Sequence, residues 1–326
     1  MKPVIRLAFA LACAVVPAAG AEEIAVAQYG ATTSAMPWAV ALAKGFFKDA
    51  GVDVTAVRAS AGGSADIRNM IAGNLVYAES ALGAVITAVQ NGAEVKIVSE
   101  NVHTNANDMW LVMPDSPVKS FADLKGKRLA FTTPQSTSEL LDHLLVAKAG
   151  LQNSDVKYVS AGPFAAELTA LQTGGADVAS LAEPLYTMNK GKYRVLAWAR
   201  DTVDPFPATI GVVPSEVART RPEAVRAILV ARRRAVEFMI ANRQESAEII
   251  AKVYKLPPDV VKEVIDRLID NPSTGNVAYW GFGDFRAEGM DKLMEGLKLI
   301  NALDSNIPWR SLVDQSFLPP DLKRPL

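Results

Sequence analysis

The chain has 326 residues, of which half are hydrophobic, 34 are basic, 35 are acidic and one is a cysteine. This near-neutral charge provides no attraction for nucleic acid or for an anionic membrane surface, so we expect neither as a partner. A single cysteine excludes an internal disulfide and a cysteine-based metal site, so the hydrophobic core has to hold the fold together.

Residues 1–21 have the pattern of a bacterial export signal. They combine a basic start with the apolar centre Val4–Val16 and with Ala19 and Ala21 at the −3 and −1 positions of a cleavage site. The apolar centre is far shorter than the ~20 residues of a membrane span. We therefore expect cleavage after Ala21 and a periplasmic location. Lipidation of Cys13 is an alternative, although the residues before it fit a lipidation site poorly.

The mature chain begins with a pattern of strand, loop, helix and strand. A polar loop between a buried strand and a helix amino terminus is where open α/β sheets bind small molecules. Pro37 suits a first helical turn, and Gly51 can adopt the left-handed conformation that ends a helix. The predicted elements are a strand over Ile24–Gln28, a loop over Tyr29–Met36, a helix over Trp38–Ala50 and a strand over Val52–Val57.

The alternation of strands and helices continues as far as residue 199. Regular alternation favours βαβ units and mostly parallel sheets, so we expect an α/β fold. Helices are predicted from Ser64, over Ala81–Gln90, up to Ala149, up to Thr173 and from Glu183. Strands are predicted at Leu75–Ala78, Val95–Ser99, Met109–Met113, Arg128–Phe131, Val156–Val159, Asp177–Leu181 and Tyr193–Ala199.

Two lobes are expected, because single cores stop growing at roughly 250–300 residues. Asp201–Pro207 contains two prolines and is predicted to be an extended return to the first lobe. We predict that 22–106 and 205–326 form the first lobe, that 107–204 form the second, and that the two crossings form a hinge. Beyond the return the composition becomes helical, with helices predicted at Glu216–Arg219, Pro222–Asn242, Glu245–Tyr254, Pro258–Leu268 and Phe285–Ile300.

Three consecutive arginines, Arg232–Arg234, lie within the helix predicted for Pro222–Asn242. Charged residues on a helix usually form a face that is turned toward water. We therefore expect all three side chains to be solvated.

Five weak motifs stand in order along the chain, at Ala39–Val57, Ala59–Leu82, Asp123–Phe131, Gln135–Leu141 and Gly174–Pro184. Together they resemble the periplasmic substrate-binding proteins of nitrate/sulfonate/taurine-type (NitT/TauT) ABC transporters. The resemblance spans the mature chain and is specific for the family, but not for one ligand. It implies a type II periplasmic-binding-protein fold whose two lobes close on a solute, and delivery of that solute to a membrane permease.

The densest group of hydroxyl side chains follows the strand predicted at Arg128–Phe131 and precedes a helix. Helix-end N–H groups and hydroxyls can hold a carboxylate, sulfonate or phosphate without a basic side chain. The alternative is that Ser136 or Ser138 only caps the helix, a role worth ~1 kcal/mol. From this loop we predict ligand contacts by Thr133, Gln135, Ser136, Thr137 and Ser138.

The first lobe offers ligand-binding candidates on loops that also follow predicted strands. Gly62 and Gly63 precede a helix start, where the missing side chains let a ligand approach the backbone. An ordinary tight turn explains these glycines equally well, and core packing is the alternative for Met36. The predicted ligand-binding residues of this lobe are Ser34, Met36, Pro37, Gly62, Gly63, Ser64 and Ser80.

Glu183 follows the strand predicted at Asp177–Leu181 and precedes Pro184. The helix dipole stabilises a carboxylate at a helix start, which is a sufficient structural reason for this residue. In the family that the chain resembles, this acid–proline step lines the cleft. We therefore predict that Glu183 accepts hydrogen bonds from a ligand amine or from the facing lobe. The residues leave open whether the ligand also contacts His103, Trp110, Arg200 or Trp280.

A receptor for transport is the function that these observations favour. We expect a monomer, without cofactor or metal, that closes on a small anionic or zwitterionic organic solute of the sulfonate or carboxylate class. Its partner would be an ABC permease in the inner membrane. One alternative is an enzyme of the same fold related to thiamine-pyrimidine synthesis, whose histidine- and cysteine-rich site this sequence lacks. The other is a ligand sensor for a membrane receptor, which the residues do not distinguish from a transport receptor.

Overall fold

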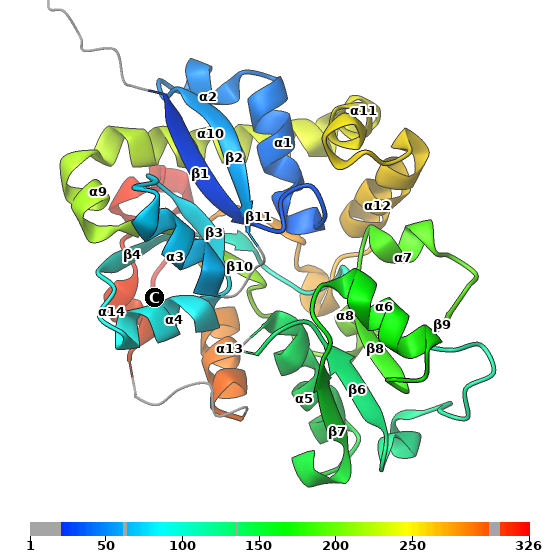
Figure 1. Ribbon diagram of the computed structural model, residues 1–326. Helices are drawn as coiled ribbons and strands as arrows, with labels where there is room; N and C mark the ends of the chain where they lie inside the picture. Colours follow the sequence, from blue (N-terminus) through cyan, green and yellow to red (C-terminus); the bar gives the residue numbers. More distant parts are fainter. Residues whose placement is uncertain (1–20, 61–63, 135, 300–306) are drawn as a thin grey trace, which may run out of the picture.

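The computed structural model describes residues 21–60, 64–134, 136–299 and 307–326, which form two β-sheets flanked by helices (Figure 1). The predicted export signal and Cys13 lie outside the described residues. No helix in the part of the chain that the structure describes is long and apolar enough to cross a membrane.

The first sheet has six strands in the order β11-β4-β10-β3-β1-β2. β1 pairs in parallel with β2 and β3, whereas β10 runs antiparallel to β3 and β4, and β11 runs antiparallel to β4. The parallel part of this sheet therefore comes from the βα units at the start of the chain, and later segments add antiparallel strands. The bounds are β1 Glu22–Ala27, β2 Val54–Ser60, β3 Ala78–Ser80, β4 Val95–Val102, β10 Thr209–Pro214 and β11 Trp280–Gly283.

The second sheet has five strands in the order β7-β6-β8-β5-β9. β6 is parallel to β7 and β8, and only β5 is antiparallel to its neighbours. No helix separates β4 from β5 in the chain, so β5 enters this sheet directly from the first one. The bounds are β5 Asp108–Val112, β6 Arg128–Phe131, β7 Lys157–Ser160, β8 Val178–Ala182 and β9 Arg194–Trp198.

The chain passes between the sheets twice, at 103–107 and at 203–208, and helices pack on both lobes. This confirms the predicted α/β fold with two lobes joined by two crossings. The prediction of mostly parallel sheets is wrong, because the strands that lie beside the crossings, β4, β5 and β10, run antiparallel to their neighbours. The helices are α1 Met36–Ala43, α2 Phe46–Asp49, α3 Ser64–Ala72, α4 Leu82–Gln90, α5 Thr137–Lys148, α6 Phe164–Gln172, α7 Leu185–Met188, α8 Ala199–Thr202, α9 Ser215–Thr220, α10 Pro222–Ala241, α11 Arg243–Tyr254, α12 Pro258–Asp270, α13 Ala287–Leu299 and α14 Trp309–Leu312. Short 3-10 turns lie at Thr33–Ala35, Phe121–Leu124, Asn153–Asp155, Thr274–Asn276, Gln315–Phe317 and Pro320–Leu322.

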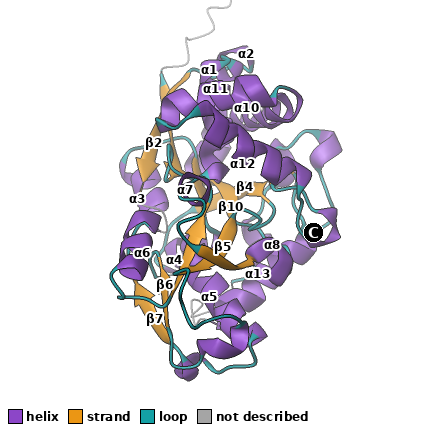
Figure 2. Cartoon of the chain, turned by 90° about the vertical axis from the view of Figure 1, so that its right-hand side faces the viewer, coloured by secondary structure: helices purple, strands orange, loops and turns teal. Residues whose placement is uncertain are grey.

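Helices of the first lobe also reach the second lobe. α12 packs beside α11 and contacts α7, which follows β8 of the second sheet (Figure 2). α13 packs against α5 in the same way. The carboxyl-terminal helices therefore bridge the lobes rather than covering the first lobe alone.

Three local predictions of secondary structure differ from the structure. The strand predicted at Leu75–Ala78 is β3, which begins only at Ala78 and ends at Ser80. The helix predicted at Trp38–Ala50 is divided into α1 and α2, because Gly45 between them has a φ of 70°, which a helix cannot contain. Strands β10 and β11 fall in the segment where only helices were predicted. Gly211 makes β10 possible between its neighbours, since a Cβ there would collide with the side chains of Tyr77 and Ser99.

The expectation of three solvated arginines at Arg232–Arg234 is wrong for Arg232, which is 1% exposed. Its guanidinium donates to the backbone oxygens of Gly281 at 2.7 Å and Asn101 at 2.5 Å. The reason is helical periodicity, because residue 232 continues the buried stripe that α10 turns toward the sheet. Arg233 and Arg234 lie on the outer side and pair with surface carboxylates.

Candidate functional site

A cavity of about 110 Å³ lies between the two lobes. Its walls are loops at the ends of strands from both sheets, together with the two chain crossings. The lining residues of the first lobe and the second crossing are Ala27, Gln28, Thr32, Ser34, Asp66, Ala81, Ala208, Thr209 and Tyr279. Those of the first crossing and the second lobe are Asn105, Asn107, Asp108, Thr132, Thr133, Ser136, Thr137, Ser138 and Phe164.

In the second lobe the wall is the hydroxyl loop between β6 and α5. Ser138 Oγ accepts a hydrogen bond from the backbone N–H of Thr132 at 3.0 Å and lies 2.8 Å from Thr132 Oγ1. Ser136 Oγ accepts from the N–H of Glu139 at 3.2 Å and so caps α5. The capping alternative therefore holds for Ser136, while the same residue also lines the cavity.

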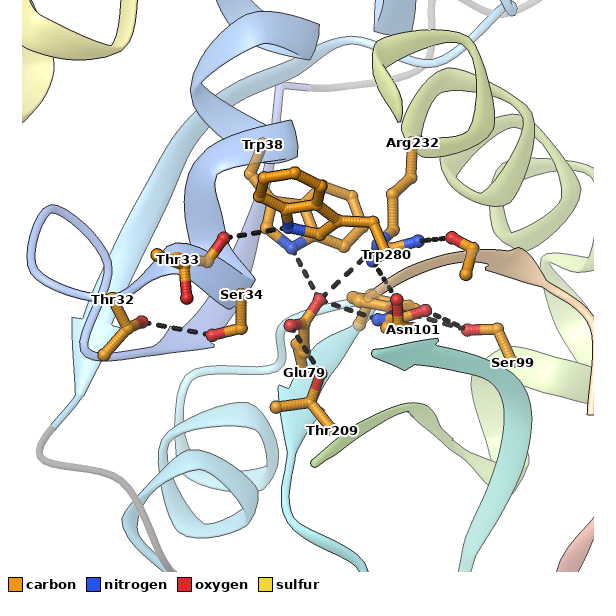
Figure 3. Close-up of polar contacts among 12 residues, drawn as sticks. Thr32, Thr33, Ser34, Trp38, Glu79, Ser99, Asn101, Thr209, Arg232 and Trp280 are labelled. Atoms are coloured by element: carbon orange, nitrogen blue, oxygen red, sulfur yellow. Dashed lines mark hydrogen bonds and ion pairs between the residues drawn. The ribbon is translucent and has the colours of Figure 1, made fainter. Parts of the chain in front are cut away.

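In the first lobe the wall is the turn that carries Thr32 and Ser34, whose hydroxyl oxygens lie 3.1 Å apart (Figure 3). Two aromatic residues hydrogen-bond to this turn. Trp280 Nε1 donates to the backbone oxygen of Thr33 at 3.0 Å, and the Tyr279 hydroxyl lies 2.7 Å from Thr33 Oγ1. Strand β11, which sequence reasoning missed, therefore positions the Ser34 turn.

A buried polar network surrounds Glu79 (Figure 3). Its carboxylate accepts from Trp38 Nε1 at 2.7 Å, from Asn101 Nδ2 at 2.7 Å and from Thr209 Oγ1 at 2.8 Å, and Arg232 Nε lies 3.6 Å away. Burial raises the pKa of Glu79, and Arg232 with the three donors opposes that shift. Because Thr209 also lines the cavity, the network fixes one of its walls.

The structure brings five predicted residues together at this cavity, namely Ser34, Thr133, Ser136, Thr137 and Ser138. Met36 and Pro37 lie in the buried first turn of α1 instead, and Ser80 is buried and donates to Asp66 Oδ2 at 2.8 Å. Gly62, Gly63 and Gln135 lie outside the described residues, as does the side chain of Ser64. Ligand contact by these residues stays a prediction.

Glu183 lies beside the cavity rather than in its wall, and it is 1% exposed. Its carboxylate accepts from the Thr187 N–H at 3.1 Å, from Thr187 Oγ1 at 3.0 Å and from Arg267 of α12. Burial raises the pKa of Glu183, and Arg267 opposes that shift. The residue therefore meets a helix of the facing lobe through an ion pair.

The four residues for which the sequence left ligand contact open do not line the cavity. His103 is buried with Nδ1 2.7 Å from Glu100 Oε1, and Trp110 Nε1 donates to Asp142 at 2.8 Å. Arg200 stacks on Trp198, and Trp280 bonds to Thr33 as described above. Burial by itself lowers the pKa of His103, but Glu100 and Asp284 more than offset this and raise it to about 9.

Sequence reasoning missed the acidic and amide side chains of the cavity. Burial raises the pKa of Asp66 to about 7, against the hydrogen bond from Ser80, and it raises the pKa of Asp108 to about 8. Asn105 Oδ1 and Asn107 Oδ1 are buried and accept no hydrogen bond from the described residues. The polar segment between β4 and β5 was the available signal, since Asn105, Asn107 and Asp108 all follow a buried strand.

A second, more apolar cavity of about 250 Å³ adjoins the first and shares Gln28 and Phe164 with it. Together the two cavities are within the roughly 300–1,000 Å³ of typical small-molecule sites. The other residues that line the second cavity are Gly30, Ala31, Pro163, Ala165, Ala182, Pro184, Leu185, Met188 and Leu256.

Known structures share this two-lobed arrangement. The crystal structure of the periplasmic aliphatic sulphonate binding protein SsuA from Escherichia coli matches with a TM-score of 0.75 and 19% identity, over 90% of this chain and 92% of that one. The periplasmic nitrate-binding protein NrtA from Synechocystis PCC 6803 matches with a TM-score of 0.70 and 16% identity, over 92% and 87% of the two chains. At these identities the matches show the fold.

A curated relative and a family model extend the comparison to sequence. The "Putative aliphatic sulfonates-binding protein" of Escherichia coli (strain K12) is 27% identical over 183 residues, which are 56% of each chain. The model of the family described as NMT1/THI5 like matches residues 32–246, which span both walls of the cavity. Because this match covers more than half of the sequence, the chain belongs to the NMT1/THI5-like family.

Proposed function

We propose that the protein is a periplasmic solute receptor that delivers a small organic solute to an ABC permease. The observation that carries this proposal is the cavity between the lobes, whose walls are hydroxyl-bearing loops of both sheets. Relatives support it, since SsuA and NrtA are periplasmic and are named for the sulphonates and nitrate that they bind. The proposal includes the lobe limits of 22–106 with 205–326 and 107–204, and a monomeric receptor.

Binding by such a receptor is a closure of two lobes around the solute. Contacts to Ser34 on one lobe and to Thr133 and Thr137 on the other exist together only when the lobes are close. A solute that touches both walls therefore favours the closed arrangement, and the crossings at 103–107 and 203–208 supply the hinge. Closure also removes water from the cavity, which strengthens the polar contacts inside.

We propose binding without chemistry at this site. No histidine or cysteine occurs among the described residues that line the cavity. The hydroxyls of Thr132, Ser136 and Ser138 bond to one another rather than to an imidazole that could activate one of them. Curated relatives are likewise named as binding proteins.

A melting-temperature screen of the mature chain tests the receptor proposal. The panel comprises sulfonates, carboxylates, amines, amino acids, oxyanions and pyrimidines. A true ligand at about 100 times its Kd should stabilise the protein by about 2.7 kcal/mol, which is readily seen. If no member of this panel raises the melting temperature, the receptor proposal fails.

A double variant and its control then test whether the ligand binds in this cavity. Thr133→Val with Thr137→Val removes two lining hydroxyls and keeps the Ser136 cap, so the unliganded melt should hardly change while the ligand-induced shift disappears. Thr169→Val on α6 is the matched control, because this residue is exposed and does not line the cavity. An undiminished shift in the double variant would move the binding site elsewhere.

A further inference from the structure

The polar lining of the cavity contains hydrogen-bond acceptors that have no donor. Asn105 and Asn107 are 3% and 7% exposed, and the Oδ1 of each accepts no hydrogen bond from the described residues. Asn105 is held in this orientation, because its Nδ2 donates to the backbone oxygen of Phe206 at 3.2 Å. Buried acceptors of this kind are costly unless a ligand or water satisfies them.

Asp108 adds a carboxyl group to the same wall. It is the first residue of β5, it is 9% exposed, and its side chain has no hydrogen bond or ion pair with the residues that the structure describes. Burial alone raises its pKa to about 8, as expected for an acid without a cation beside it. Asn105 and Asn107 lie on the first crossing, Asp108 begins β5 directly after it, and all three line the same cavity, so we call them the acceptor group.

The charged side chains that line the cavity also favour a ligand that donates hydrogen bonds. Asp66 of the first lobe and Asp108 of the second both line it, whereas no Lys, Arg or His does so among the described residues. Arg68 lowers the pKa of Asp66 from outside the lining, and Ser80 donates to that carboxylate. An anion placed beside the acceptor group would meet two carboxyl groups and no counter-charge, while a cation would be attracted to both.

The adjoining cavity indicates the chemistry of the rest of the ligand. It shares Phe164 and Gln28 with the first cavity and is lined mainly by apolar side chains, among them Leu185, Met188 and Leu256. A ligand that fills both cavities therefore has one donor-bearing polar end and an apolar body.

We propose that the solute is an organic cation whose protonated nitrogen is held by Asn105, Asn107 and Asp108, and whose apolar body passes Phe164 into the adjoining cavity. This inference rests on the proposed receptor function and narrows its ligand class. The hydroxyl loop at Thr133 and Thr137 faces the same cavity and can bind a further polar group of the solute.

Five benzene derivatives that differ in their polar group test the inference. Benzylamine and benzamidine carry a cationic head group, benzyl alcohol a neutral one, and benzoate and benzenesulfonate an anionic one. Melting shifts and titration calorimetry should show binding of the two cations and none of the two anions. In Asp108→Asn the affinity for benzamidine should fall at least tenfold. Asp142→Asn is the control, because this carboxylate is also buried but does not line the cavity.

Proton release provides a readout on the unmutated protein. The titratable groups around Asp108 are Asp66, which lines the same cavity, and Glu167 and Tyr279, which interact electrostatically with Asp108. A bound cation favours the ionised carboxylates of Asp108 and Asp66, so benzamidine binding at pH 6.5 should release protons, which buffers of different ionisation enthalpy reveal. At pH 9 both carboxyl groups are already ionised and the release should be much smaller. Equal proton release at both pH values, or none at either, would overturn the inference.

The outcomes separate this inference from the receptor proposal. Binding of benzoate or benzenesulfonate in place of the cations overturns the inference and supports the receptor proposal. Absence of binding by all five compounds also overturns the inference, and the broader solute panel then decides on the receptor proposal independently. Binding of the cations with unchanged affinity in Asp108→Asn would overturn the assigned acceptor group.

Discussion

Three arginines that are adjacent in sequence have different environments in this protein. Each step along a helix turns the side chain by about 100°, so Arg232 points to the sheet while Arg233 and Arg234 point to solvent. The buried guanidinium faces Glu79, whose other partners are donors that line or support the cavity. Arg232 thereby helps to position Thr209 in the cavity wall, although Arg232 itself does not line the cavity.

Replacing Arg232 should therefore cost much more stability than replacing its neighbour. Arg232→Ala leaves Glu79 buried without a cation, a change that typically costs about 3–5 kcal/mol. Arg233→Ala, the matched control, removes exposed pairs with Glu237 and Asp321 and should cost less than about 1 kcal/mol. Urea unfolding measures both. Similar losses in the two variants would mean that the buried pair is not structurally important.

At the level of elements, the ion pair between Glu183 and Arg267 joins the end of β8 to α12. Arg267 also packs over the rings of Tyr186 and Trp198, with distances of 5.6 and 5.3 Å from its guanidinium carbon to the ring centroids. α12 belongs to the carboxyl-terminal helices, whereas the other groups belong to the second lobe. This contact exists only while the lobes are together.

Loss of this contact should favour the open arrangement. Arg267→Met removes the cation that faces the buried Glu183, so we expect a larger radius of gyration of the unliganded protein in X-ray scattering. Affinity for the ligand found in the screen should fall by about tenfold, or roughly 1.4 kcal/mol. Arg243→Met is the control, since Arg243 pairs with Asp266 and Asp270 within the carboxyl-terminal helices. An unchanged radius and affinity in Arg267→Met would exclude a role of the pair in closure.

Across the whole molecule, several buried groups have a pKa that is higher in the folded chain than in the unfolded one. Burial raises the pKa of Asp66 and Asp142 to about 7 and that of Asp108 to about 8. The pKa of His103 is raised to about 9 by Glu100 and Asp284, although burial opposes this. All four groups therefore bind a proton more tightly in the folded chain than in the unfolded one.

The unliganded protein should consequently become less stable between pH 6 and pH 9. Unfolded carboxyl groups ionise near pH 4, and an unfolded histidine loses its proton near pH 6.5. The folded chain therefore binds more protons in this range, and the free energy of unfolding falls by roughly 1.4 kcal/mol per pH unit for each proton of difference. Melting temperatures at pH 6.0, 7.5 and 9.0 measure the effect, and Asp142→Asn should reduce it. A melting temperature that rises with pH would contradict this prediction.

The hydroxyl-bearing part of the candidate site was predictable, because it depends on local order along the chain. Ser34, Thr133 and Ser136–Ser138 follow strands and precede helices, and this pattern by itself places them at the edge of a sheet. Asp66 lies within helix α3, so no local pattern shows that its side chain reaches the cavity. Asp108 follows the polar segment after β4, but that segment does not show that the residue also begins a strand between β8 and β9. Thr209 reaches the cavity only because β10 inserts between β3 and β4.

The sequence by itself determined the alternation of strands and helices, the two lobes and the hydroxyl loops, because apolar periodicity and turn residues act over a few positions. Only the tertiary structure decided that Arg232 is buried, that β10 and β11 complete the first sheet, and that Asp66 and Asp108 face one cavity. Strand order, burial and charge environment arise from contacts between segments that are far apart in the chain, and no local pattern records those contacts.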